Sequence, residues 1–165
     1  MNNSKYVARG GLYTALGVLF IYLSSVTPTS KLYILGIASC IIPLSIMTTK
    51  IQNSFFVYIA TSLLSLLLLG VRSNVLAYIL FFGLYGFAKF YIERLRNLPI
   101  EIFFKLLFFN VSIGITYMLY NIFFTGLYNN NIPIYAVILI LQVVFLVFDY
   151  ALTVFINYIG RRFLK

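Results

Sequence analysis

The sequence predicts an all-α, polytopic integral membrane protein with six transmembrane helices in one bundle. Its 165 residues are 62% hydrophobic and 9% charged, with a mean hydropathy of +1.02. A soluble domain carries about a quarter of its residues as charged side chains, so this chain is too apolar for that class. Apolar runs recur from end to end, and no polar stretch exceeds about ten residues. We therefore expect one transmembrane domain over residues 1–165.

Charged or turn-forming residues divide the chain into six apolar runs, and a spanning helix needs about 20 residues. The expected spans are 7–27, 32–49, 54–70, 75–92, 102–125 and 133–158. Pro28, Pro99 and Pro133 lie in the breaks, where helices cannot easily continue. The second and third runs are short, so flanking residues or local bilayer thinning must help them across. The first run lacks a convincing signal-peptide cleavage site, and we expect it to be retained as a helix.

The distribution of basic residues predicts the orientation. Six spans put both termini on one side, and only Lys31 and Arg72 of the twelve Lys and Arg residues then lie on the other side. Cytoplasmic loops are enriched in Lys and Arg, so we expect both termini in the cytoplasm. The net charge of +9 is expected to meet anionic membrane lipid, and nucleic acid is not an expected partner.

Polar and small side chains recur at helical spacing inside the last two spans. The span at 102–125 carries Asn110, Gly114, Tyr117 and Asn121. The span at 133–158 carries, every seven residues, Tyr135, Gln142 and Asp149. Lipid offers polar groups no partner, so these faces should turn toward other helices or a cavity. Two interpretations stay open: simple helix packing, or a cavity that hydrogen-bonds a small polar solute.

Asp149 is the single aspartate and lies well inside the last span. An ionised carboxylate there is costly unless it is paired, so we expect it to face the bundle interior. Lys105 and Lys89 enter the membrane from the same side and have long side chains that reach inward. We favour a structural ion pair over a proton or cation site, because a chain without histidine offers too few groups for a proton relay.

The chain carries no motif for catalysis or for a cofactor. Histidine is absent, Cys40 stands alone, and there is no P-loop and no nucleophile beside a base. We expect no enzymatic activity, no metal and no cofactor, and any ATP would be bound by another chain. The loop "ERLRNLPIE" at 93–101 is interpreted as a solvated turn, with a docking surface as the alternative.

Small residues crowd the start of the first span, in the stretch "GGLYTALG" at 10–17. Glycine costs a helix about 1 kcal/mol relative to alanine, so several glycines here indicate a close helix contact. They fall on two adjoining stripes, one through Gly10 and Thr14 and the other through Gly11 and Ala15. The contact is expected either with this protein's own helices or with another chain.

Six short spans and a first helix that opens "ARGGLYTALGVLFIYLSSVTP" resemble the substrate-binding S component of energy-coupling factor transporters, the bacterial vitamin uptake systems. In that family an Ala-x-x-x-Ala type motif on the first helix docks on a shared transmembrane coupling protein. Gly11 and Ala15 match this motif as small-x-x-x-small, with Gly10 and Thr14 beside them. The resemblance implies uptake of a small vitamin-like solute, with separate coupling and ATPase subunits as partners. It also implies that the chain lies in the plasma membrane of a bacterial cell, with both termini in the cytoplasm.

The resemblance also implies a solute pocket toward the extracellular ends of the helices. The matching region comprises Ser24, Ser25, Thr27, Lys31, Arg72, Asn74, Tyr78, Tyr117, Tyr120, Asn121, Tyr135 and Gln142. The candidate substrate-binding residues among these are Arg72, Tyr78, Tyr117, Asn121, Tyr135 and Gln142. The chain departs from the family in its short first loop and in its lack of tryptophan.

The alternative is a non-transporting membrane scaffold or assembly protein of the rod-shape-determining type, with no ligand. That family typically carries a Gly-Leu-x-x-Asp pattern near its third helix, whereas "SLLSLLLLGVRSN" here has no acid.

Overall fold

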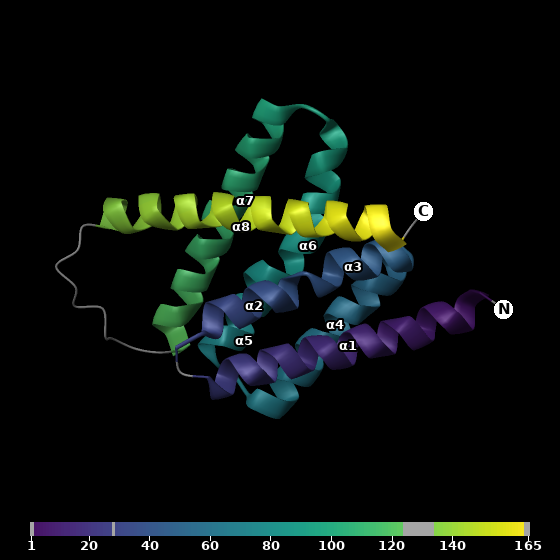
Figure 1. The fold of residues 1–165 in the computed structure, drawn as a ribbon. Coiled ribbons are helices and arrows are strands. Elements are labelled where there is room, and N and C mark those ends of the chain that lie inside the picture. Colours follow the sequence, from purple (N-terminus) through teal and green to yellow (C-terminus); the bar gives the residue numbers. More distant parts are fainter. Residues whose placement is uncertain (1, 28, 124–133, 164–165) are drawn as a thin grey trace.

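The computed structural model describes residues 2–27, 29–123 and 134–163, and all the regular structure in these ranges is helical (Figure 1). The first half contains α1 (Asn2–Val26), α2 (Lys31–Ser39), α3 (Ile41–Thr48), α4 (Ile51–Leu69) and α5 (Ser73–Ala77). A π-helical turn, η1 (Tyr78–Phe82), leads into α6 (Gly83–Ile92) and the 3₁₀ turn η2 (Glu93–Leu95). The chain ends with α7 (Leu98–Phe123) and α8 (Ile134–Phe163). The predicted all-α fold class is confirmed for the described residues.

Six helical stretches in these ranges are long and apolar enough to cross a membrane. They are Ser4–Val26, Lys31–Thr48, Ile51–Leu69, Ser73–Leu95, Leu98–Met118 and Ile138–Arg161. Each overlaps an expected span, so the number of candidate spans is confirmed and the boundaries shift by a few residues. Pro99 lies in the first turn of α7, where a missing backbone N–H costs nothing.

The second span is a broken helix rather than the continuous one that its apolar run predicts. It divides at Cys40 into α2 and α3, and the Cys40 N–H bonds the Ile37 carbonyl in a tightened turn. Pro43 explains the break, because its ring lacks an N–H and would clash with the carbonyl four residues earlier, that of Ser39.

The fourth span contains the π-helical turn η1. A π turn widens the helix locally and changes which backbone groups pair. The hydroxyl of Tyr58, on α4, donates a hydrogen bond of 2.9 Å to the carbonyl of Ile79 within this turn. The widened turn is therefore tied to the neighbouring helix by a side chain.

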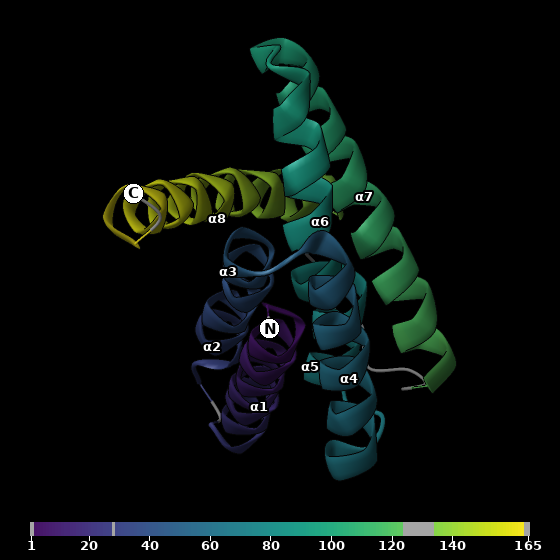
Figure 2. The same cartoon turned by 90° about the vertical axis from the view of Figure 1, so that its right-hand side faces the viewer.

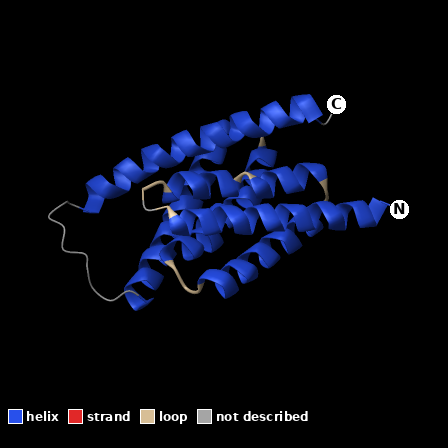
Figure 3. Ribbon diagram, turned by 60° about the horizontal axis from the view of Figure 1, so that its bottom comes forward, coloured by secondary structure: helices blue, strands red, loops and turns tan. Residues whose placement is uncertain are grey.

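The helices do not all run along one axis. In Figures 1 and 2, α6 and α7 form a hairpin that crosses α8 steeply and projects beyond the other helices. The start of α1 and the end of α8 lie at the same end of the molecule, as Figure 3 also shows. This is the arrangement that an even number of spans produces.

Three buried apolar clusters hold the helices together. The first joins α1, α2, α5 and η1 through Ile21, Leu35, Ala38, Val75, Tyr78 and Phe82. The second joins α6, α7 and α8 through Tyr85, Phe109, Phe145 and Leu152. The third joins α3 and α4 through Ile42, Ile46 and Val57.

Candidate functional site

A cluster of four charged side chains joins α6, η2, α7 and α8, and its two lysines are buried. The Lys105 ammonium lies 2.8 Å from Asp149 Oδ2 and 3.0 Å from Glu93 Oε1. The Lys89 ammonium lies 2.7 Å from Glu93 Oε1 and also pairs with Asp149 Oδ1. The structure thus brings Asp149 together with both lysines that the sequence analysis named, and it adds Glu93 to them.

Hydroxyl groups form further hydrogen bonds with the side chains of this charge cluster. Tyr85 donates a hydrogen bond of 2.6 Å to Asp149 Oδ1. Lys89 donates one of 2.7 Å to the hydroxyl of Thr153, which itself donates to the Asp149 carbonyl. The side chain of Lys89 is only 1% exposed, so these protein groups take the place of water around its charge.

The charge cluster is balanced, with two ammonium groups against two carboxylates. Charges taken out of water are tolerated only when they are paired and their remaining hydrogen-bonding capacity is filled. Each carboxylate here is already engaged by both lysines. This geometry favours a structural role, since a proton or cation site needs a group that can change partner.

Glu93 is the member of the cluster that sequence reasoning assigned to a solvated turn. Its side chain is 32% exposed, and its carboxylate points inward to both lysines. The signal was present in the sequence, because Lys89 and Glu93 are four residues apart and such pairs meet on a helix face. Tyr85 lies one turn before Lys89 on the same face.

Aromatic rings pack on the inner side of the charge cluster. The rings of Phe109 and Phe145 stack at 4.4 Å between centroids, and Tyr85 meets Phe145 edge to face at 5.2 Å. Phe81 contacts both Tyr85 and Phe109. This apolar layer excludes water, which makes each ionic contact stronger and the loss of a partner more costly.

The two small-residue stripes of α1 have different environments. Gly10 and Gly17 are buried against α4, where an added Cβ would lie 3.0 Å from Asn53 Nδ2 and 2.8 Å from Thr61 Cγ2, respectively. Gly11 and Ala15 are exposed, and an added Cβ at Gly11 would meet nothing within 4 Å. Thr14 is half-buried and bonds the Gly10 carbonyl within its own helix.

The candidate substrate-binding residues are not brought together around one cavity in the described part of the chain. Arg72 and Tyr117 are exposed, whereas Tyr78 is fully buried in the first apolar cluster. Gln142 is half-buried, and its amide donates to Asn110 Oδ1 at 3.4 Å. The side chains of Asn121 and Tyr135 lie outside the described residues.

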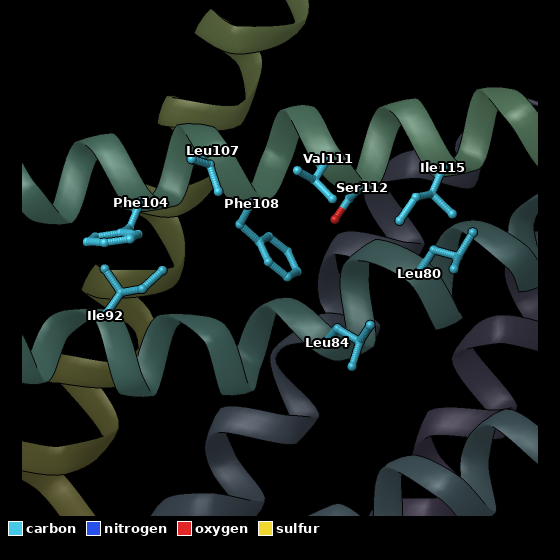
Figure 4. Close-up of a pocket in the computed structure, with 9 residues that line it drawn as sticks. All are labelled: Leu80, Leu84, Ile92, Phe104, Leu107, Phe108, Val111, Ser112 and Ile115. Atoms are coloured by element: carbon cyan, nitrogen blue, oxygen red, sulfur yellow. The ribbon is translucent and has the colours of Figure 1, made fainter.

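A groove of about 340 Å³ separates η1 and α6 from α7 (Figure 4). Helix α7 lines it with Phe104, Leu107, Phe108, Val111, Ser112 and Ile115. The other wall is formed by Leu80, Leu84 and Ile92. A second hollow lies along the C-terminal part of α8, at Val154, Asn157, Tyr158 and Arg161. Neither contains a candidate substrate-binding residue, and the groove presents an almost entirely apolar surface.

A comparison of the chain with known protein families, with curated proteins and with solved structures finds no match.

Proposed function

We propose that the chain is the membrane-embedded solute-binding component of an ATP-driven uptake transporter of the energy-coupling factor type. In this proposal it captures a small vitamin-like molecule from outside and works with a separate coupling protein and ATPase subunits. The observation that carries the proposal is the exposed face of α1 at Gly11 and Ala15.

This face differs from an ordinary lipid-facing surface. Association of helices in a bilayer depends on close backbone approach, which glycine and alanine permit. The adjoining residues Gly10 and Gly17 already serve such an approach to α4. Gly11 and Ala15 offer the same small surface at exposed positions, and no described residue would meet an added Cβ at Gly11 within 4 Å. This exposed face supports docking of a helix from another protein.

The position of this face along α1 fits a coupling role. Gly11 lies in the N-terminal half of α1, and Ala15 lies at the middle of the helix. With both termini in the cytoplasm, as the basic residues predict, the N-terminal half of α1 is the one closer to a cytoplasmic ATPase.

Co-purification tests the proposal. Gly11→Leu and Ala15→Leu should each abolish recovery of the chain with tagged coupling and ATPase subunits, since a leucine holds the two helices apart. Gly114→Leu and Ala151→Leu are matched controls, because both residues are exposed on other helices. The proposal fails if all four variants co-purify like the wild type, or if the wild type does not co-purify.

The solute is tested separately. Mass spectrometry of the purified chain should find a small polar molecule released on denaturation. Replacing Gln142 by leucine should reduce its yield, whereas Gln52→Leu, at an exposed position on α4, should not.

The second candidate function is a membrane scaffold without a ligand, and one observation favours it. Asn74 of the implied pocket region already donates to Ser24 Oγ at 2.9 Å and to Ser25 Oγ at 2.6 Å, and Tyr78 is fully buried. These side chains serve helix packing in the structure. A scaffold predicts that no solute co-purifies and that depletion of the chain alters cell shape rather than uptake.

A further inference from the structure

The groove between α6 and α7 runs along two spanning helices and opens to the outside of the bundle. Its α7 wall repeats at helical spacing, and several of these side chains are about half exposed: Phe104 43%, Leu107 47%, Val111 53% and Ile115 45%. Both walls belong to stretches that qualify as membrane spans, Ser73–Leu95 and Leu98–Met118. The surroundings of the groove are therefore hydrocarbon, and an apolar chain is the chemistry that fills it.

The length of the groove matches one leaflet. Figure 4 shows Ile92 facing Phe104 at one end and Leu80 beside Ile115 at the other. Eleven residues separate Phe104 from Ile115, which is about 16 Å at about 1.5 Å per residue. Half of the hydrocarbon core is about 15 Å thick. The groove is therefore long enough to hold an acyl chain of the length that fills one leaflet.

The Ile92 end of the groove leads directly into the turn between α6 and α7, which carries positive charge. Arg94 and Arg96 are exposed, and neither forms an ion pair with another described residue. Glu93 is neutralised by Lys89 and Lys105 in the charge cluster. Glu101, in the first turn of α7, is the other acid nearby. Two arginines against one uncompensated glutamate leave the turn with a net positive charge.

We propose that this groove binds one acyl chain of an anionic phospholipid, whose phosphate is held by Arg94 and Arg96. The pairing of Glu93 with Lys89 and Lys105 serves this site, because it neutralises a carboxylate that would otherwise repel the phosphate. The site is independent of the proposed docking face on α1, which lies on a different helix.

Fluorescence quenching by brominated lipids tests the site, because the chain contains no tryptophan. The reporter is Leu107→Trp in the groove, and the control is Leu64→Trp on α4, whose side chain is similarly exposed at 42%. Each full-length variant is reconstituted in phosphatidylcholine vesicles with increasing brominated phosphatidylglycerol or brominated phosphatidylcholine. We expect Leu107→Trp to prefer the anionic lipid about five-fold or more, and Leu64→Trp to show no preference.

The arginines are then removed in the reporter background. Arg94→Gln with Arg96→Gln should make both brominated lipids quench Leu107→Trp equally. Val111→Trp provides a second reporter in the groove if Leu107→Trp does not fold. Equal quenching of the groove reporter by the two lipids with the arginines intact would overturn the proposal. Protection of the reporter from both lipids would also overturn it, and would indicate that a second copy or another protein covers the groove.

Discussion

Helices α1 to α5 and helices α6 to α8 accommodate polar side chains in the apolar bundle in two different ways. The first group uses neutral hydrogen bonds between helices, such as Ser54 to Ser45 Oγ at 2.9 Å and Tyr13 with Thr48 Oγ1 at 2.9 Å. The second group uses the charge cluster around Asp149. Within the first group, small residues of α1 bring its backbone close to α4, whereas large aromatic rings interlock among α6, α7 and α8.

This difference predicts different sensitivities. A neutral hydrogen bond contributes about 0.5–1.5 kcal/mol to stability, and its loss leaves no charge without a partner. Removing one member of a buried ion cluster costs more, because the remaining charge keeps no adequate partner. We therefore expect the packing of α7 and α8 on α6 to respond most to loss of charge, and the contact of α1 with α4 to respond most to added volume.

The largest effect is expected for Asp149→Asn. The substitution leaves two buried lysines with Glu93 as their single carboxylate, so the free energy of unfolding should fall by about 3–5 kcal/mol. Unfolding in mixed micelles, monitored as denaturing detergent is added, measures the loss. Glu101→Gln removes an acid outside the charge cluster and should change stability by about 0.5 kcal/mol or less.

A paired substitution sharpens this prediction. Asp149→Leu together with Lys105→Met removes one charge of each sign, and should cost less than Asp149→Leu alone because apolar groups can replace a buried ion pair. If the double variant is as unstable as the single one, packing of the side chain rather than charge balance sets the cost.

The next effect concerns the close contact of α1 with α4. Gly17→Ala places a methyl group 2.8 Å from Thr61 Cγ2 and should lower the free energy of unfolding by about 1 kcal/mol, the balance of overpacking and better helix propensity. Gly114→Ala adds the same methyl group where nothing lies within 4 Å, and should raise stability by about 0.5–1 kcal/mol. The same detergent unfolding assay compares them.

Thr61→Ser provides the test of mechanism, because it removes the clashing methyl group and retains a hydroxyl that can bond the Val57 carbonyl. Gly17→Ala should cost less in this background. An equal cost in both backgrounds would contradict steric contact at Thr61 as its cause.

The sequence predicted the number of candidate spans because hydropathy and span length are local properties of the chain. It also placed Asp149 inside the bundle, because an isolated intramembrane acid must find partners. The role of Glu93 depended on the direction in which the α6–α7 turn points its side chain, which loop composition does not reveal. The division of the α1 stripes into Gly10 and Gly17 on one side and Gly11 on the other depended on where α4 lies.

The π-helical turn is a second feature that hydropathy does not reveal. The run "YILFF" at 78–82 is uniformly apolar, so its wide turn leaves no periodic signal. The turn is recognised from the structure, where the hydroxyl of Tyr58, twenty-one residues before Ile79, bonds the Ile79 carbonyl.

The smallest effect tests whether that bond holds the turn. Tyr58→Phe removes the hydroxyl donor and should lower the free energy of unfolding by about 0.5 kcal/mol, because the Ile79 carbonyl loses its side-chain partner. Hydrogen exchange of the amides at 78–82 should accelerate at the same time. Tyr22→Phe, at an exposed position on α1, is the matched control and should change neither quantity. Unchanged exchange in Tyr58→Phe would contradict a role for this hydrogen bond. It would mean that the packing of Phe81 and Phe82 holds the π-helical turn without the hydrogen bond from α4.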